Sequence, residues 1–301
     1  MKPPLPVTSN DPGIRTPECS WRGIIVCALL AFQFAAYSYA RTELPRGSCD
    51  STIMFSSETM KLFVSLLMAR KAADGAWTAA GWLKACIPAL CFMAMNLLSM
   101  WSAKMVSTTA FVVVVQSKVL WTTFFSWLLL KRSLSANAAS ALVALSAGCA
   151  TAALEEASGK RGEPTVGLAL GMLALEAVLS GVSSVIVQKL FSGSLGQMWS
   201  RNVQLATLSA AWYACVSFYY GCTLRLETFE DFQLAALGAL GGILVALSLT
   251  YAGAIEKTVA TSAAVVLSAA CQAVLSAQPP SAVQGLASVA VVNAVVQFSR
   301  G

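Results

Sequence analysis

Ten long apolar segments, separated by short polar ones, dominate this sequence of 301 residues. A helix needs about 20 predominantly apolar residues to cross the hydrocarbon core of a bilayer. The segments have roughly that length and lie at residues 21–40, 53–69, 83–101, 108–130, 136–154, 166–190, 202–220, 232–251, 258–276 and 282–298. We therefore predict an all-α polytopic membrane protein with ten transmembrane helices. The second segment is the weakest by hydropathy, because it is short and carries Glu58 and Lys61.

The charged residues are few and scattered, which excludes several classes of protein. They make up 11% of the chain, against about 25% in soluble domains. Histidine is absent, so Ser-His-Asp and Cys-His nucleophile pairs and His-ligated metals cannot form. We expect a protein that is not an enzyme and that needs neither a metal nor a cofactor. The net charge of +6 is spread between the apolar segments, which indicates a lipid bilayer and not nucleic acid as the partner.

Lysine and arginine in the short loops indicate the orientation of the chain. Residues 1–20, which include five prolines, are expected to form a disordered cytosolic leader and not a signal peptide. If the N-terminus lies in the cytosol, the cytosolic loops carry about twice as many lysines and arginines as the loops on the opposite side. Arg41 is counted among the loop cations of that opposite side. With ten spans, both termini face the cytosol.

Ten spans divide into two halves of five, and an odd number of spans inverts the second half relative to the first. We therefore predict an inverted five-plus-five repeat within one membrane domain, with residues 21–154 as the first repeat and 166–298 as the second. Inverted repeats are typical of alternating-access transporters, which bind substrate near the bilayer midplane between the halves.

Polar side chains recur at helical spacing on at least six of the segments. On the third segment, Phe92, Asn96 and Ser99 share one face. Polar groups at membrane depth usually face a cavity or another helix, so we expect a central polar cavity. The other polar faces carry Glu58, Lys61 and Ser65; Ser107, Phe111, Val114 and Lys118; Glu176, Ser180, Ser183 and Ser184; Asn202, Ala206 and Ser209; and Lys257, Thr261, Ala264 and Ser268.

Lys118 is the most informative single residue, because it lies deep inside the fourth apolar segment. A lysine at such a depth costs roughly 2.5–3.5 kcal/mol on insertion scales. We interpret Lys118 as a cation that faces substrate, and snorkelling to an interface is the alternative. Lys257, near the start of the ninth segment, is either a second substrate-facing cation or a loop cation. Two lysines directed into one cavity suit an anionic, phosphorylated substrate.

Two features allow more than one interpretation. Glu58 and Lys61 lie on one helix face, so they form either a structural ion pair or part of a substrate site or gate. Glu176 either bonds a neighbouring helix or is functional. Among the nine cysteines, Cys49 and Cys222 fall in short polar loops where they can pair. Most of the others are expected to pack as small apolar residues.

A series of short motifs extends along most of the chain. They are SETMKL at 57–62, NLL at 96–98, QSK at 116–118, LS at 134–135, SGVSSVIVQK at 180–189, WSRNVQL at 199–205, LGG at 240–242, YA at 251–252, KTVATS at 257–262 and LS at 267–268. In order and spacing, the chain resembles the nucleotide-sugar transporters of the drug/metabolite transporter superfamily. The resemblance is greatest to the branch of CMP-sialic acid, UDP-galactose and UDP-N-acetylglucosamine transporters.

The resemblance implies the inverted ten-helix fold and a Golgi or endoplasmic reticulum membrane. It also implies an antiporter that exchanges a cytosolic nucleotide sugar, with a pyrimidine favoured, for lumenal nucleoside monophosphate. Family analogy allows a homodimer. By the same resemblance, Lys118 and Lys257 contact phosphate, Asn96, Ser180 and Asn202 contact nucleotide or ribose, Glu58 lies near the sugar end or gate, and Gly181 lets helices approach closely.

The chain departs from the family pattern at three positions around the nucleotide. Where many members have aromatic hydroxyls, this chain has Phe92, Phe111 and Ala206. Two stacking faces therefore remain without their hydroxyls, and the base and sugar stay open. The alternative function is a drug/metabolite-type exporter of another organic anion or metabolite, coupled to protons or to phosphate.

Overall fold

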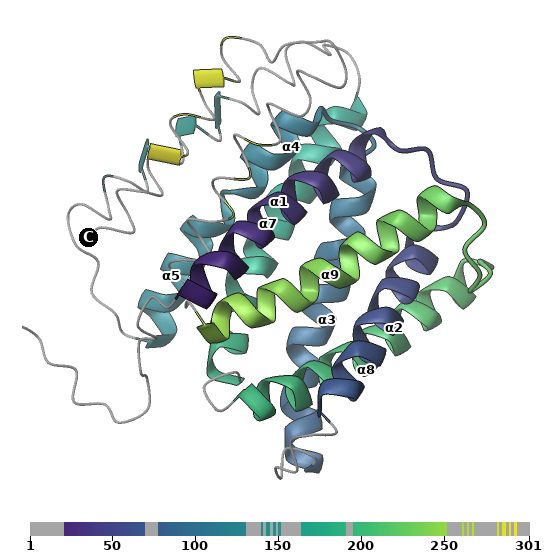
Figure 1. Cartoon of the computed structure of the whole chain (residues 1–301). Coiled ribbons are helices and arrows are strands. Elements are labelled where there is room, and N and C mark those ends of the chain that lie inside the picture. The colour runs from purple at the N-terminus through teal and green to yellow at the C-terminus, as the bar shows by residue number, and fades with distance from the viewer. Residues whose placement is uncertain are drawn as a thin grey trace, which may run out of the picture.

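The computed structural model describes residues 21–69, 78–130, 164–190 and 195–251, with single positions between 140 and 151 and between 261 and 293. All regular structure in these residues is helical (Figure 1). The helices are α1 (Trp21–Glu43), α2 (Asp50–Ala69), α3 (Ala79–Ser102), α4 (Thr108–Val115), α5 (Lys118–Leu130), α7 (Pro164–Leu190), α8 (Leu195–Tyr219) and α9 (Phe229–Tyr251). Each forms within or around a predicted apolar segment, which confirms the all-helical class for this part of the chain.

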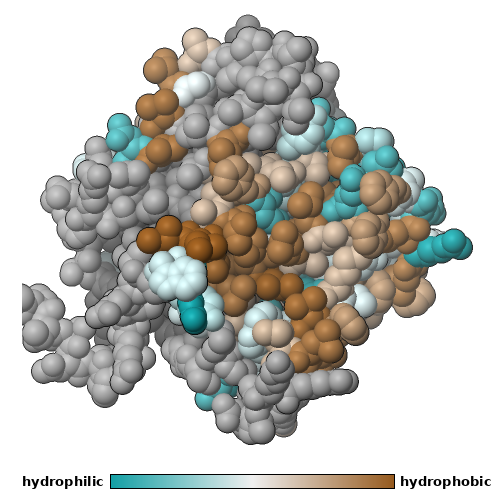
Figure 2. Space-filling model, in the orientation of Figure 1, coloured by the Kyte–Doolittle hydropathy of each residue, from teal (hydrophilic) through white to brown (hydrophobic). Residues whose placement is uncertain are grey.

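Five of these helices, namely α1, α2, α3, α7 and α9, are long and apolar enough to cross a bilayer. Their outer faces carry exposed apolar side chains such as Ile24, Phe32 and Leu240. Figure 2 shows apolar side chains across the face that α1 and α9 form, with hydrophilic ones gathered at the end where α1 leads into α2. A contiguous apolar face of this kind is suited to lipid and not to water.

Several predicted segments cannot be compared with the structure. The segments at 136–154, 258–276 and 282–298 fall largely outside the described residues, and residues 1–20 fall wholly outside them. The ten-helix count, the inverted five-plus-five repeat and the repeat bounds of 21–154 and 166–298 therefore stay predictions.

Helices from the two halves of the chain pack against each other. α1 lies beside α9, and α2 packs along α8 (Figure 1). α3 contacts both α7 and α8, and α5 contacts α7. One buried cluster joins Ile53 of α2, Met100 of α3, Tyr213 of α8 and Leu234 of α9. The residues that hold the bundle together are therefore far apart in sequence.

The fourth apolar segment, predicted as one helix over residues 108–130, is interrupted in the structure. A turn at Gln116 and Ser117 separates α4 from α5, and the amides of these two residues donate to carbonyls three residues earlier at 3.1 and 3.0 Å. The buried Gln116 side chain donates from Nε2 to the Thr261 carbonyl at 2.9 Å. The prediction of one helix was wrong because hydropathy is similar on both sides of the turn. Such breaks are tolerated in membranes where neighbouring groups satisfy the backbone.

A disulfide and several hydrogen bonds join the α1–α2 loop to the α8–α9 loop. Cys49 and Cys222 form the disulfide, with Cα atoms 6.2 Å apart, which decides the pairing that the sequence leaves open. The Asp231 carboxylate accepts from the Ser48 hydroxyl at 2.8 Å and from the Ser48 amide at 3.0 Å. The Ser48 hydroxyl accepts from the Glu227 amide at 2.9 Å. We call these five residues the loop clasp, because they tie the two halves of the chain at one end of the bundle.

Gly181 lies where α7 packs against α5. A Cβ atom added to Gly181 would come 2.6 Å from Trp121 Cβ and 2.8 Å from the Thr122 backbone nitrogen. Both distances are below van der Waals contact, and neither atom is the end of a flexible side chain. The glycine therefore sets how closely these two helices can approach, which in turn positions the first turn of α5.

Replacement of Gly181 by alanine tests this contact. We expect Gly181→Ala to lower the stability of the protein by roughly 1–3 kcal/mol, because the two backbones must separate. The matched control is Gly171→Ala on the same helix, where an added Cβ meets nothing within 4 Å. Alanine favours helix over glycine, so the control is expected to be neutral or slightly stabilising. Thermal unfolding in detergent measures both, and equal melting of the two variants would show that α5 and α7 do not pack this closely.

Candidate functional site

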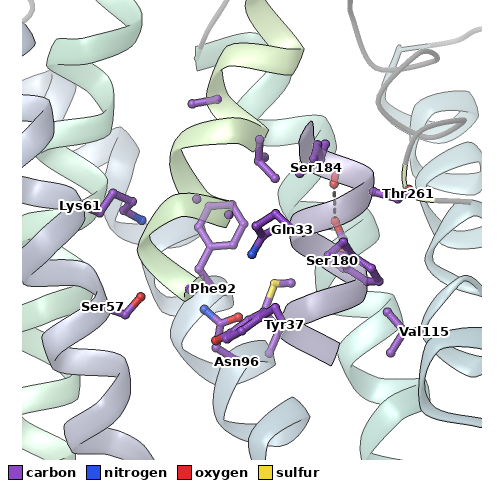
Figure 3. A pocket seen from close by; sticks show the side chains of 18 of the residues that line it. Gln33, Tyr37, Ser57, Lys61, Phe92, Asn96, Val115, Ser180, Ser184 and Thr261 are labelled. Carbon is purple, nitrogen blue, oxygen red and sulfur yellow. Dashed lines mark hydrogen bonds between the residues drawn. The ribbon is translucent and has the colours of Figure 1, made fainter. Parts of the chain in front are cut away.

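A cavity of about 220 Å³ lies between the helices, and side chains from all eight of them line it together with Thr261. Figure 3 shows Gln33, Tyr37, Phe92 and Asn96 around this space, although α1 and α3 are distant in sequence. The polar helix faces predict a cavity shared by many helices, and the described part of the chain contains one.

Charged side chains from four helices line this cavity. The cations are Arg41, Lys61 and Lys118, and the carboxylates are Glu58 and Glu176. Charges at membrane depth need a partner or water, because hydrocarbon does not solvate them. Cations outnumber carboxylates by one among these lining residues, so the cavity wall favours an anionic ligand.

Glu58 and Lys61 form an ion pair within α2, with Oε2 and Nζ 2.5 Å apart and side chains 9% and 12% exposed. Lys61 extends over Gly242 of α9, where an added Cβ would come 2.8 Å from Lys61 Cδ. Next to it, a Cβ on Gly241 would come 2.5 Å from Gln33 Nε2. These two glycines therefore leave room for polar side chains of α1 and α2 at the wall of the cavity.

Lys118 is the first residue of α5, and its Nζ lies 4.8 Å from the centre of the Phe34 ring. The Val119 and Leu120 amides of α5 donate to the Gln116 and Ser117 carbonyls of the turn, both at 3.0 Å. Lys118 therefore places its ammonium group at the cavity wall where α4 passes into α5. A cation–π contact stabilises the ammonium group without supplying a counter-charge, so Lys118 still attracts an anion.

Arg41 is a functional candidate that is wrongly counted as a loop cation from the sequence. It is not in a loop, because α1 continues to Glu43, and Arg41 is buried and lines the cavity. Its guanidinium carbon lies 4.1 Å from the centre of the Tyr37 ring, and Nη1 donates to the Ser99 hydroxyl. The sequence does contain a pattern that identifies Arg41 as helical. Gln33, Tyr37 and Arg41 are four residues apart, so they share one helix face, and this face extends past the end of the apolar segment.

Two asparagines of the cavity wall are held by neighbouring helices. Asn96 Nδ2 donates to the Tyr213 hydroxyl at 3.2 Å, and that hydroxyl donates to the Phe92 carbonyl at 3.4 Å. Asn202 Nδ2 donates to the Ser65 hydroxyl at 3.2 Å. Because these bonds connect α3 with α8 and α8 with α2, both amides are oriented before any ligand binds.

Most of the predicted site residues meet in this one cavity. Those that line it are Glu58, Phe92, Asn96, Phe111, Lys118, Ser180 and Asn202. Gly181 instead packs against α5, and Ala206 is fully buried within α8. Lys257 lies outside the described residues, so its position beside Lys118 stays a prediction.

Comparison with known proteins connects this geometry to a family. The family model described as nucleotide-sugar transporter matches residues 23–299. The UDP-galactose translocator of Mus musculus is 31% identical over 201 residues, which are 62% of this chain and 50% of that protein. The UDP-galactose/UDP-N-acetylglucosamine transporter srf-3 of Caenorhabditis elegans is 30% identical over 198 residues, which are 62% of this chain and 53% of that protein.

The chain spans about half the length of these curated relatives. A solved crystal structure superposes with a TM-score of 0.67 at 16% identity, covering 93% of this chain and 99% of that chain. At such identity the likeness concerns the fold alone. The matched family and the named relatives are transporters and not enzymes, which agrees with the expectation from the composition.

The Glu58–Lys61 pair generates a testable prediction. Lys61→Met leaves Glu58 buried without its partner, and we expect it to reduce stability by about 3 kcal/mol. The double variant Glu58→Gln/Lys61→Met removes both charges and is expected to recover most of that loss. Thermal unfolding of the four proteins in detergent forms a double-mutant cycle. Strictly additive losses would mean that the two side chains do not stabilise each other.

Proposed function

We propose a transport activity for this chain, which belongs to the nucleotide-sugar transporter family. In this proposal the protein carries a pyrimidine nucleotide sugar across a membrane in exchange for a nucleoside monophosphate. The observation that carries it is one cavity in which Arg41 and Lys118 face the same space as Asn96 and Asn202. Cations suit phosphate groups, and oriented amides suit a base and a ribose.

The phosphate groups are assigned to Arg41 and Lys118. These two side chains interact electrostatically with each other, so an anion between them relieves their repulsion. Arg41 Nε is buried and has no hydrogen-bond partner within the described residues, so it has a donor to offer. Lys257 is predicted to join this group.

The nucleoside is assigned to the polar and aromatic side chains of α3, α4, α7 and α8. Asn96, Asn202 and Ser180 offer hydrogen-bonding groups to the base and ribose. Phe92 and Phe111 line the same space and offer aromatic faces for stacking. Glu58, already paired with Lys61, is placed at the sugar end of the ligand.

The loop clasp supports an assignment of membrane side. Disulfides persist in oxidising compartments and are rare in the cytosol, so the α1–α2 and α8–α9 loops would face a lumen. That orientation agrees with the predicted cytosolic termini and with a membrane of the Golgi or endoplasmic reticulum. A homodimer remains a prediction from family analogy.

Exchange follows from the excess positive charge of the cavity. Enclosing uncompensated cations between helices removes them from water, which is unfavourable at low dielectric. A bound anion offsets that penalty. The transition between the states that open to opposite sides of the membrane is therefore favoured when a nucleotide is bound. Nucleotide sugar would move one way and nucleoside monophosphate the other.

Replacement of Lys118 tests the phosphate role. We expect Lys118→Ala to reduce trans-stimulated exchange in proteoliposomes by about tenfold or more, because a charged hydrogen-bonding partner of phosphate is lost. The matched control is Lys84→Ala, which removes an exposed lysine of α3 and is expected to leave exchange unchanged. Full exchange by Lys118→Ala would contradict the assigned role.

A ligand screen tests the substrate class. We expect UMP or CMP to raise the melting temperature of the purified protein more than GMP or AMP, since the named relatives carry uridine nucleotides. A second experiment uses the proteoliposomes of the exchange assay, which now contain no nucleotide and carry a pH gradient across the membrane. Uptake of another metabolite driven by protons, with no shift from any nucleotide, would support the exporter alternative.

A further inference from the structure

Glu176 of α7 has no part in the phosphate and nucleoside contacts assigned above. Its side chain is 6% exposed and lines the cavity one helical turn from Ser180. Its Oε2 is buried without a hydrogen-bond partner in the described part of the chain. A carboxylate at this depth is unfavourable unless another charge compensates it. In a cavity that binds an anion, the carboxylate also repels the ligand.

The compensating charges are the two cations assigned to phosphate. Glu176 lines the same cavity as Arg41 and Lys118, and it interacts electrostatically with both cations. The Ser99 hydroxyl of α3 accepts a hydrogen bond from Arg41 Nη1, which holds the guanidinium at the cavity wall. The ion pairs found among the described residues do not include Glu176, so the compensation acts at a distance.

We propose that Glu176 is an internal counter-ion, which compensates Arg41 and Lys118 in the empty cavity and competes with the phosphate of the substrate. The inference rests on the proposed function, because it assigns those cations to phosphate. Since Glu176 acts through space and not by direct contact, Arg41 Nε and the Lys118 ammonium group remain available to an incoming anion. That anion is bound less tightly than it would be by the two cations alone.

The counter-ion also sets the balance between exchange and one-way transport. A fully uncompensated cavity would return empty only rarely, because its cations would have to be enclosed without an anion. Glu176 lowers that penalty and permits some empty return. The wild-type protein is therefore expected to show measurable uptake into liposomes that contain no nucleotide, in addition to its exchange.

A different role for Glu176 predicts the opposite result on mutation. A buried carboxylate oxygen without a partner can accept a hydrogen bond from a ribose or hexose hydroxyl. In that case removal of the negative charge would weaken ligand binding. In the counter-ion role, the same removal strengthens the binding of phosphate-containing ligands and leaves an uncharged nucleoside unaffected.

Glu176→Gln separates the two roles. We expect this isosteric variant to bind UMP, UDP and pyrophosphate about tenfold more tightly than the wild type, because a repulsive charge near the phosphate is removed. Uridine affinity is expected to stay the same, and the ratio of exchange to one-way uptake is expected to rise. Glu176→Asp retains the charge and should behave like the wild type. The matched control is Glu227→Gln, an exposed carboxylate of the α8–α9 loop, which should change none of these values.

The four ligands distinguish failure of this inference from failure of the proposed function. Weaker or equal binding of UMP, UDP and pyrophosphate by Glu176→Gln, with melting as in the wild type, would overturn the counter-ion role. If pyrophosphate binds and no nucleotide does, the proposed substrate is wrong, and tighter pyrophosphate binding by Glu176→Gln still supports the counter-ion. If none of the anions binds either protein, both are wrong.

Discussion

The structure depends on the compensation of charged side chains inside a bilayer, because hydrocarbon cannot solvate them. Five charged side chains face one cavity inside a bundle whose exterior is apolar. Each is stabilised differently. Glu58 and Lys61 are in direct contact, Lys118 lies against an aromatic ring, and Arg41 lies against the Tyr37 ring and donates to the Ser99 hydroxyl. Glu176 interacts with both Arg41 and Lys118 at a distance. Since Arg41, Lys118 and Glu176 belong to α1, α5 and α7, these three helices must pack together before the charges on them compensate one another.

Small residues and a broken helix make that assembly sterically feasible. Glycines on α9 leave space for the side chains of Gln33 and Lys61, and Gly181 lets α7 approach α5. The turn between α4 and α5 then places Lys118, the first residue of α5, at the wall of the cavity. The interruption converts one spanning segment into two shorter pieces that meet at the cavity.

Much of the cavity could be predicted from the spacing of polar residues, since a polar side chain in lipid must face inward. That reasoning finds Asn96, Lys118, Ser180 and Asn202. It fails for Arg41, because hydropathy ends the first segment before the helix itself ends. It also fails for the turn at Gln116, which depends on a bond to a residue that is distant in sequence. In both places hydropathy alone is not enough, because it reports neither the end of a helix nor a hydrogen bond to a distant residue.

The disulfide between Cys49 and Cys222 has a consequence for motion. It joins the connection of the first two helices to the connection of α8 and α9, which belong to the other half of the chain. At that end of the bundle, these four helices cannot separate between the halves. While the disulfide is intact, an entrance at that end therefore cannot open between the α1–α2 pair and the α8–α9 pair. One covalent bond between two loops thus restricts which helices of the bundle can part.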